Sequence, residues 1–195
     1  MSISSFSLII ANLVPLIGVL FFGWSLFQIM ILYWLETAII GFWNIIKMFK
    51  VGGIQGLSFG LFFIFHFGLF MLVHLMFIII VFGQIGFGPL AEPLRKLSDG
   101  LLVAVLPSFL IMLASHTVSF FTNFIYKGER KQANVSLLFT APYGRIAMMH
   151  LTIIIGGFAS LILHQPIWSL VLLVTLKTLA DLFVHVREHP QKTDY

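Results

Sequence analysis

Two features are scarce in this chain of 195 residues. It contains no cysteine, and charged residues make up only 9% of it. The absence of cysteine excludes disulfide bonds, thiolate metal sites and covalently attached c-type haem. Soluble domains carry charge on about a quarter of their residues, so the low charge excludes that class. The first residues, MSISSF, include no lysine or arginine, and no small-residue cleavage site follows the first apolar run. We therefore expect the first apolar segment to remain as a membrane span rather than to be removed as a signal peptide.

Long apolar runs dominate what is present, because hydrophobic residues make up 59% of the chain. Runs of about 18 or more apolar residues are long enough to cross a bilayer. Run length and the breaks between runs predict one all-α domain over residues 1–195, a polytopic membrane protein with a six-helix bundle. The six predicted spans are 4–22, 25–48, 58–84, 100–127, 145–164 and 166–188. We expect the Gly- and Pro-rich segment 83–100 to be a loop, and the short apolar stretch Leu137–Phe139 to lie in the membrane interface.

The basic residues predict the orientation, because cytoplasmic loops hold an excess of lysine and arginine. With both termini in the cytoplasm, only Arg95 and Lys96 fall outside, and Lys177 falls within the last span. The other eight basic residues then lie on the cytoplasmic side: Lys47, Lys50, Lys127, Arg130, Lys131, Arg145, Arg187 and Lys192. This distribution predicts a multi-pass membrane protein with both termini cytoplasmic. The expected partner is the lipid bilayer, with a homo-oligomer left open and no nucleic acid expected.

Ionisable residues within the predicted spans gather between the middle of the bilayer and its cytoplasmic face. Their depths from the cytoplasmic ends of the spans, at about 1.5 Å per residue, are about 18 Å for Glu36, 16 Å for His116 and Lys177, 12 Å for His66, 10 Å for Asp181, 8 Å for His150 and 5 Å for His185. His74 falls in the opposite leaflet, where we expect it to have no special role. Each ionisable group costs roughly 2.5–3.5 kcal/mol in the membrane, so a shared partner would offset a large penalty.

The preferred hypothesis is that this partner is a transition metal, zinc or iron, which supports a membrane-embedded reaction. Imidazole and carboxylate groups are the ligands that these metals favour, and Asp181 and His185 are spaced to reach one ion from one helical face. The predicted metal ligands are His66, His116, His150, Asp181 and His185. Glu36 is the predicted catalytic residue, acting as a general base. The further buried polar groups are Asn44, Asn123 and Lys177. A b-type haem held by His66 and His116 is a variant of this hypothesis.

Three other classes of function fit the same residues. A proton-coupled transporter or channel would use Glu36, His116, Asp181 and Lys177 as a relay, because intramembrane chains of carboxylates and histidines suit proton movement. An intramembrane hydrolase would use Glu36 as the general base on a metal-bound or histidine-held water. A membrane interaction protein would need the polar groups only as a paired core, since a single intramembrane histidine is most often simply hydrogen-bonded. The sequence leaves these functions open.

The segment YWLETAIIGFWNIIKM in the second predicted span carries a resemblance. It is similar to a segment on an early helix in a prokaryotic family of small integral membrane proteins of unknown function, with the pattern Tyr-Trp-x-Glu…Gly…Asn. The residues that match are Tyr33, Trp34, Glu36, Gly41 and Asn44. The resemblance implies a six-span fold in a prokaryotic inner membrane and singles out Glu36. It implies no activity.

Overall fold

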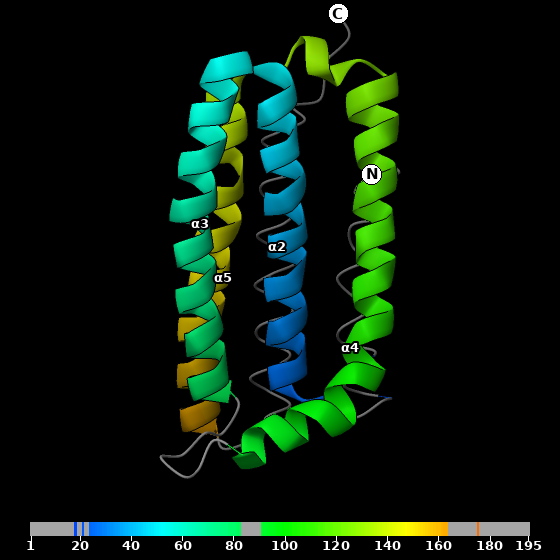
Figure 1. Ribbon diagram of the computed structural model, residues 1–195. Helices are drawn as coiled ribbons and strands as arrows, with labels where there is room; N and C mark the ends of the chain where they lie inside the picture. The colour runs from blue at the N-terminus through cyan, green and yellow to red at the C-terminus, as the bar shows by residue number, and fades with distance from the viewer. Residues whose placement is uncertain (1–17, 19–20, 22–23, 83–90, 164–174, 176–195) are drawn as a thin grey trace, which may run out of the picture. The chain divides into compact units, whose positions relative to one another are not determined.

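A computed structural model describes residues 18, 21, 24–82, 91–163 and 175 of the chain (Figure 1). Two compact units are present, one formed by Phe27–His150 and the other by Met1–Leu26 with Leu151–Tyr195. The described elements are α2 (Leu26–Val51), α3 (Gly53–Phe82), α4 (Ala91–Ser119), the π-helix η1 (Phe120–Tyr126), the 3₁₀ helix η2 (Glu129–Lys131) and α5 (Val135–Leu163). These elements are all helical, which confirms the all-α class for the described part of the chain.

Four helical segments are long and apolar enough to cross a membrane: Phe27–Val51, Gly53–Val81, Val105–Tyr126 and Val135–Ile155. The chain is therefore a multi-pass membrane protein by helix length and composition. These segments overlap the second to fifth predicted spans. The predicted spans 4–22 and 166–188 lie outside the described residues, apart from positions 18, 21 and 175, and the orientation in the membrane stays a prediction.

A very short hairpin joins α2 to α3, where the sequence predicted a longer connection. Gly52 alone separates the two helices, and its amide donates to the Met48 carbonyl at 3.1 Å. Gly53 has a φ of +53°, a left-handed conformation that glycine adopts without steric cost. A side chain on Gly56 would collide with the Met48 carbonyl. So short a connection makes α2 and α3 antiparallel neighbours, as Figure 1 shows.

Helix α5 begins ten residues before the predicted fifth span. Asn134 caps its first turn, because its Oδ1 accepts a hydrogen bond from the Ser136 amide at 2.8 Å. Leu137–Phe139, expected in the membrane interface, forms part of this continuous helix, and Arg145, expected at the first position of the fifth span, lies ten residues inside it. Pro142 lies buried within α5.

The buried side chain of Asn44 explains how α5 tolerates this proline. Proline has no N–H, so Pro142 leaves the carbonyl four residues earlier, that of Leu138, without its usual helical donor. Asn44 on α2 donates its Nδ2 hydrogen to this same carbonyl. In an apolar environment a backbone carbonyl must find a donor within the protein, and a neighbouring helix is one source of it. Asn44 thereby holds α2 against α5.

Helix α4 begins at Ala91, so the second half of the predicted loop 83–100 is helical. Figure 1 shows that the first part of α4 lies at an angle to the rest, which runs alongside α2. The helix continues into the π-helix η1, whose widened turn ends with the Lys127 amide bonded to the Thr122 carbonyl at 2.9 Å. Phe120 and Phe124 of η1 are buried.

Helix α2 contacts η1, α3 and α5. Its Trp43 ring stacks on Phe120, with 4.5 Å between centroids, and the Lys47 Nζ lies 5.3 Å from the centroid of the Phe124 ring. Gly41 is so close to the Phe67 ring on α3 that no side chain would fit there. Helix α2 therefore positions polar groups from the other helices.

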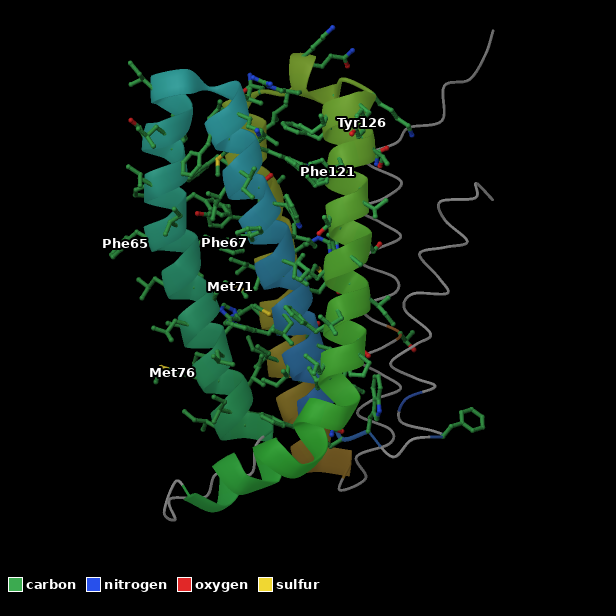
Figure 2. All side chains as sticks on the ribbon, turned by 45° about the vertical axis from the view of Figure 1, so that its right-hand side comes forward. Phe65, Phe67, Met71, Met76, Phe121 and Tyr126 are labelled. Carbon is green, nitrogen blue, oxygen red and sulfur yellow. The ribbon has the colours of Figure 1, made fainter. Side chains whose placement is uncertain are left out.

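Helix α3 divides into an inward and an outward face. Phe67 and Met71 point into the bundle, whereas Phe65 and Met76 point away from it (Figure 2). Phe65 is 73% exposed and Met71 only 5%. An outward face of large apolar side chains matches contact with the acyl chains of a bilayer.

Candidate functional site

Glu36 forms an ion pair across the bundle with Arg145, a residue that the sequence analysis placed at the cytoplasmic end of the fifth span. The Arg145 Nη1 on α5 lies 3.4 Å from the Glu36 Oε1 on α2, and the Arg145 and Glu36 side chains are 43% and 22% exposed. Eight residues along α2 from Glu36, Asn44 meets Leu138, which lies seven residues before Arg145 on α5. The two contacts agree on one antiparallel register. Glu36 therefore has a basic partner within the described part of the chain, and the sequence analysis did not single out this partner.

His116 on α4 approaches this ion pair from a third helix. The contacts of Trp43 with Phe120 and of Lys47 with Phe124 advance four residues on both helices, so α2 and the end of α4 run parallel. One turn back from Trp43 and Phe120, the same register sets His116 level with Ile39, close to Glu36. His116 interacts electrostatically with Glu36, Arg145 and Lys47. Groups from α2, α4 and α5 thus meet inside three candidate spans.

A second polar pair joins α3 to α5. The His66 Nδ1 and the Tyr143 hydroxyl are 2.6 Å apart. The Phe62 ring stacks on the His66 ring with centroids 5.3 Å apart, and Phe63 contacts Tyr143 edge-to-face at 6.0 Å. Aromatic rings on two sides favour a fixed geometry for this hydrogen bond. The sequence analysis did not single out Tyr143 as a partner for His66.

A third pair consists of two histidines, one of which was expected to have no special role. The His74 Nε2 on α3 lies 3.2 Å from the His150 Nδ1 on α5, and His74 is only 3% exposed. The His74 Nδ1 lies 2.7 Å from the Phe70 carbonyl, which can only accept, so Nδ1 carries a proton. In the neutral pair the His74 Nε2 is then the acceptor and the His150 Nδ1 the donor. Because the Phe70 carbonyl cannot pass a proton on, this pair can take up a proton but offers no onward step through His74.

The depth predicted for His150 was counted from residue 145, whereas α5 begins at Val135. Fifteen residues of helix span about 22 Å, so His150 lies well inside its helix, where it meets His74. The earlier start of α5 also places Arg145 inside the helix, where it reaches Glu36.

All five residues that carry the sequence resemblance face neighbouring helices. The Trp34 Nε1 donates to the Met71 carbonyl on α3 at 2.7 Å, and Tyr33 is 7% exposed. Glu36 pairs with Arg145, Gly41 lies against Phe67, and Asn44 bonds to Leu138. These residues therefore fix the contacts of α2 as well as the position of Glu36.

The predicted metal ligands are divided among separate contacts. His66 pairs with Tyr143, His150 pairs with His74, and His116 lies near Glu36. Within the described ranges, no group of three or more histidine, aspartate or glutamate residues is placed to hold a metal ion. Lys177, Asp181 and His185 lie outside the described residues, so the full predicted set is not tested. Asn123 bonds to the Ser119 hydroxyl of its own helical segment at 3.2 Å rather than to another helix.

The model of a family of unknown function, DUF6498, matches residues 1–194. The chain belongs to this family. The match confirms that the chain belongs to a family of unknown function, as the sequence resemblance indicated. No curated protein and no solved structure matches the chain. For this member of DUF6498, function must therefore be argued from the site itself.

Proposed function

We propose that this protein moves a small solute or protons through the polar interior of its helix bundle, with Glu36 as the group that binds the proton. The observation that carries the proposal is the meeting of Glu36, Arg145 and His116 from three helices within candidate spans. Charges inside a membrane are expensive, and they typically mark pathways for ions or substrates. Purely apolar side chains would have avoided this cost.

The arrangement of the polar contacts along the bundle supports a path rather than an isolated pair. On α2, side chains from Trp34 to Asn44 reach across to neighbouring helices. On α3, His66 and His74 lie two turns apart, about 12 Å along the helix axis. These groups cover about half of a hydrocarbon core that is roughly 30 Å thick.

The Glu36–Arg145 pair has two states, and the binding or release of a proton at Glu36 converts one into the other. When Glu36 is ionised, it neutralises Arg145 across the gap between α2 and α5. When a proton binds to Glu36, the attraction is lost and the guanidinium is free to move or to take another partner. A change of partner within the bundle biases the equilibrium between two conformations, as an alternating transporter requires. We assign to His116, which lies near Glu36, the exchange of protons with this carboxylate.

Proton movement in proteoliposomes tests this proposal. Vesicles with an internal pH-sensitive dye are given an imposed potential and, in separate runs, sulfate, succinate, glucose or lysine. We expect proton flux above that of empty vesicles with at least one solute. Glu36→Gln should abolish this flux while the protein still accumulates in the membrane. Glu129→Gln, which removes an exposed acid of η2, is the matched control and should leave the flux unchanged. Flux that persists in Glu36→Gln would contradict the proposal.

We also propose, as a second function, a transition-metal site that includes His150. The orientation of His74 favours such a site. The His74 Nδ1 donates to a backbone carbonyl while its Nε2 faces the His150 Nδ1, and histidine ligands of metals typically make such a bond with the nitrogen that does not bind the metal. Asp181 and His185 would complete a donor set suited to zinc or iron. Elemental analysis and an absorption spectrum of the purified protein test this function. Stoichiometric zinc or iron supports it, a Soret band points to haem b, and metal-free protein contradicts it.

A further inference from the structure

We propose that Arg145 forms a binding site for a small oxyanion, which replaces Glu36 as the partner of the guanidinium when Glu36 is protonated. This inference rests on the proposed function, because it names the chemical class of the solute. The ligand is a carboxylate, sulfate or phosphate group of the kind that a guanidinium binds with two parallel hydrogen bonds.

The first support is the incomplete use of the Arg145 donors. A guanidinium carries five N–H groups. Among the residues that the structure describes, Glu36 is the one acceptor that Arg145 contacts, through a single Nη1 at 3.4 Å. Charge-assisted hydrogen bonds are normally about 2.7–2.9 Å long, so this contact is loose. With 43% of its side chain exposed inside a candidate span, Arg145 has donors left for a second acceptor.

The second support is the charge balance around Glu36. In the described candidate spans Glu36 is the one acid, whereas Lys47, Lys50 and Arg145 are basic. Lys47 is directed over the Phe124 ring and also interacts electrostatically with Glu129 in η2. The excess of positive charge grows when Glu36 is protonated, and an anion is the ligand that offsets it in a poorly solvated site.

Proton and anion binding are then coupled in a definite direction. Ionised Glu36 competes with the oxyanion for Arg145, so protonation of Glu36 strengthens anion binding, and by linkage the anion strengthens proton binding. Among the described residues, His116 on α4 is a titratable group near this pair, and His66 with Tyr143 between α3 and α5 lies one layer away. Protonation of His116 acts in the same direction, because it adds positive charge.

Sulfate is a suitable probe because it stays doubly charged between pH 5.5 and pH 8, roughly. The melting temperature of the detergent-purified, full-length protein is measured against sulfate concentration, with chloride holding the ionic strength constant, and the dependence gives a Kd. We expect wild-type protein to bind sulfate more tightly at the lower pH. Glu36→Gln should bind sulfate about tenfold more tightly at the higher pH, because the competing charge is gone. It should also lose most of the pH dependence, and Glu36→Gln/His116→Asn should lose the remainder.

Arg145→Gln should abolish the stabilisation by sulfate, and Arg145→Lys should weaken it because the planar fork is lost. Arg130→Gln is the matched control, since it removes an exposed arginine of η2 that bonds to the Lys50 carbonyl at 3.1 Å. If Arg145→Gln does not fold, Glu36→Gln still decides the matter. Unchanged or weaker sulfate binding in Glu36→Gln would overturn the inference. The inference would also be overturned if sulfate stabilised neither the wild-type protein nor Glu36→Gln.

Nanodiscs distinguish the two sources of an oxyanion. Stabilisation by phosphatidylglycerol over phosphatidylcholine that depends on Arg145, without an effect of sulfate, would identify a lipid headgroup as the anion. Stabilisation by sulfate in both lipids would identify a free solute. Failure of this inference can be told from failure of the proposed function. Proton flux that depends on Glu36 without any oxyanion binding overturns the inference alone, and oxyanion binding without proton flux overturns the transport proposal alone.

Discussion

The hydrogen bond from Asn44 to the Leu138 carbonyl on α5 leads to a quantitative prediction about the stability of the protein. Asn44 satisfies the Leu138 carbonyl because Pro142 cannot. Asn44→Leu leaves this carbonyl without a donor in a buried position, since Asn44 is only 7% exposed. The loss of a buried partner costs about 1–3 kcal/mol. Pro142→Ala restores an N–H four residues after Leu138, so the same Asn44→Leu change should cost less in that background.

A double-mutant cycle isolates this effect. Hydrogen bonds between membrane helices average about 0.6 kcal/mol and reach about 1.7 kcal/mol, so we expect a coupling free energy in that range. The free energy of unfolding is measured for all four proteins in mixed micelles by titration with a denaturing detergent. Asn123→Leu is the control, because Asn123 bonds within its own helical segment and should show no coupling to Pro142→Ala. Equal costs of Asn44→Leu in both backgrounds would refute the assignment of Asn44 to the proline-freed carbonyl.

Three further predictions concern packing and the histidine pair, and unfolding in micelles measures all of them. His150→Phe should lower the free energy of unfolding by about 1–3 kcal/mol, because it leaves the buried His74 Nε2 without a partner. The double variant His74→Phe/His150→Phe should be destabilised less than His150→Phe alone. A double variant less stable than His150→Phe would contradict the pairing. Gly41→Leu should cost about 1–3 kcal/mol through its collision with the Phe67 ring, and Phe67→Ala should recover part of the loss. Gly53→Ala should cost about 1 kcal/mol because of its positive φ; wild-type stability would show that the hairpin adopts another conformation.

Arg145 shows why part of the site escaped prediction from sequence. It follows Pro142 and Gly144, residues that usually interrupt helices, and it was counted as a marker of orientation at the start of the fifth predicted span. Asn44 removes the penalty of this proline, and it does so from a helix about 90 residues away in the chain. Once α5 is continuous, Arg145 reaches Glu36 and His150 reaches His74. One signal was available in the sequence, namely that a buried acid at Glu36 requires a cation somewhere in the bundle.

The sequence by itself determined that the chain is helical and crosses a membrane, through its long apolar runs and the Gly and Pro residues between them. That property is local, because each span must satisfy its own backbone in lipid and bury few charges. The sequence also determined that Glu36 needs a partner, since an isolated carboxylate there would be too costly. Only the tertiary structure decided which residues pair. Pairing depends on where each helix begins and on its register against its neighbours, and both follow from contacts between distant segments such as Asn44 with Leu138.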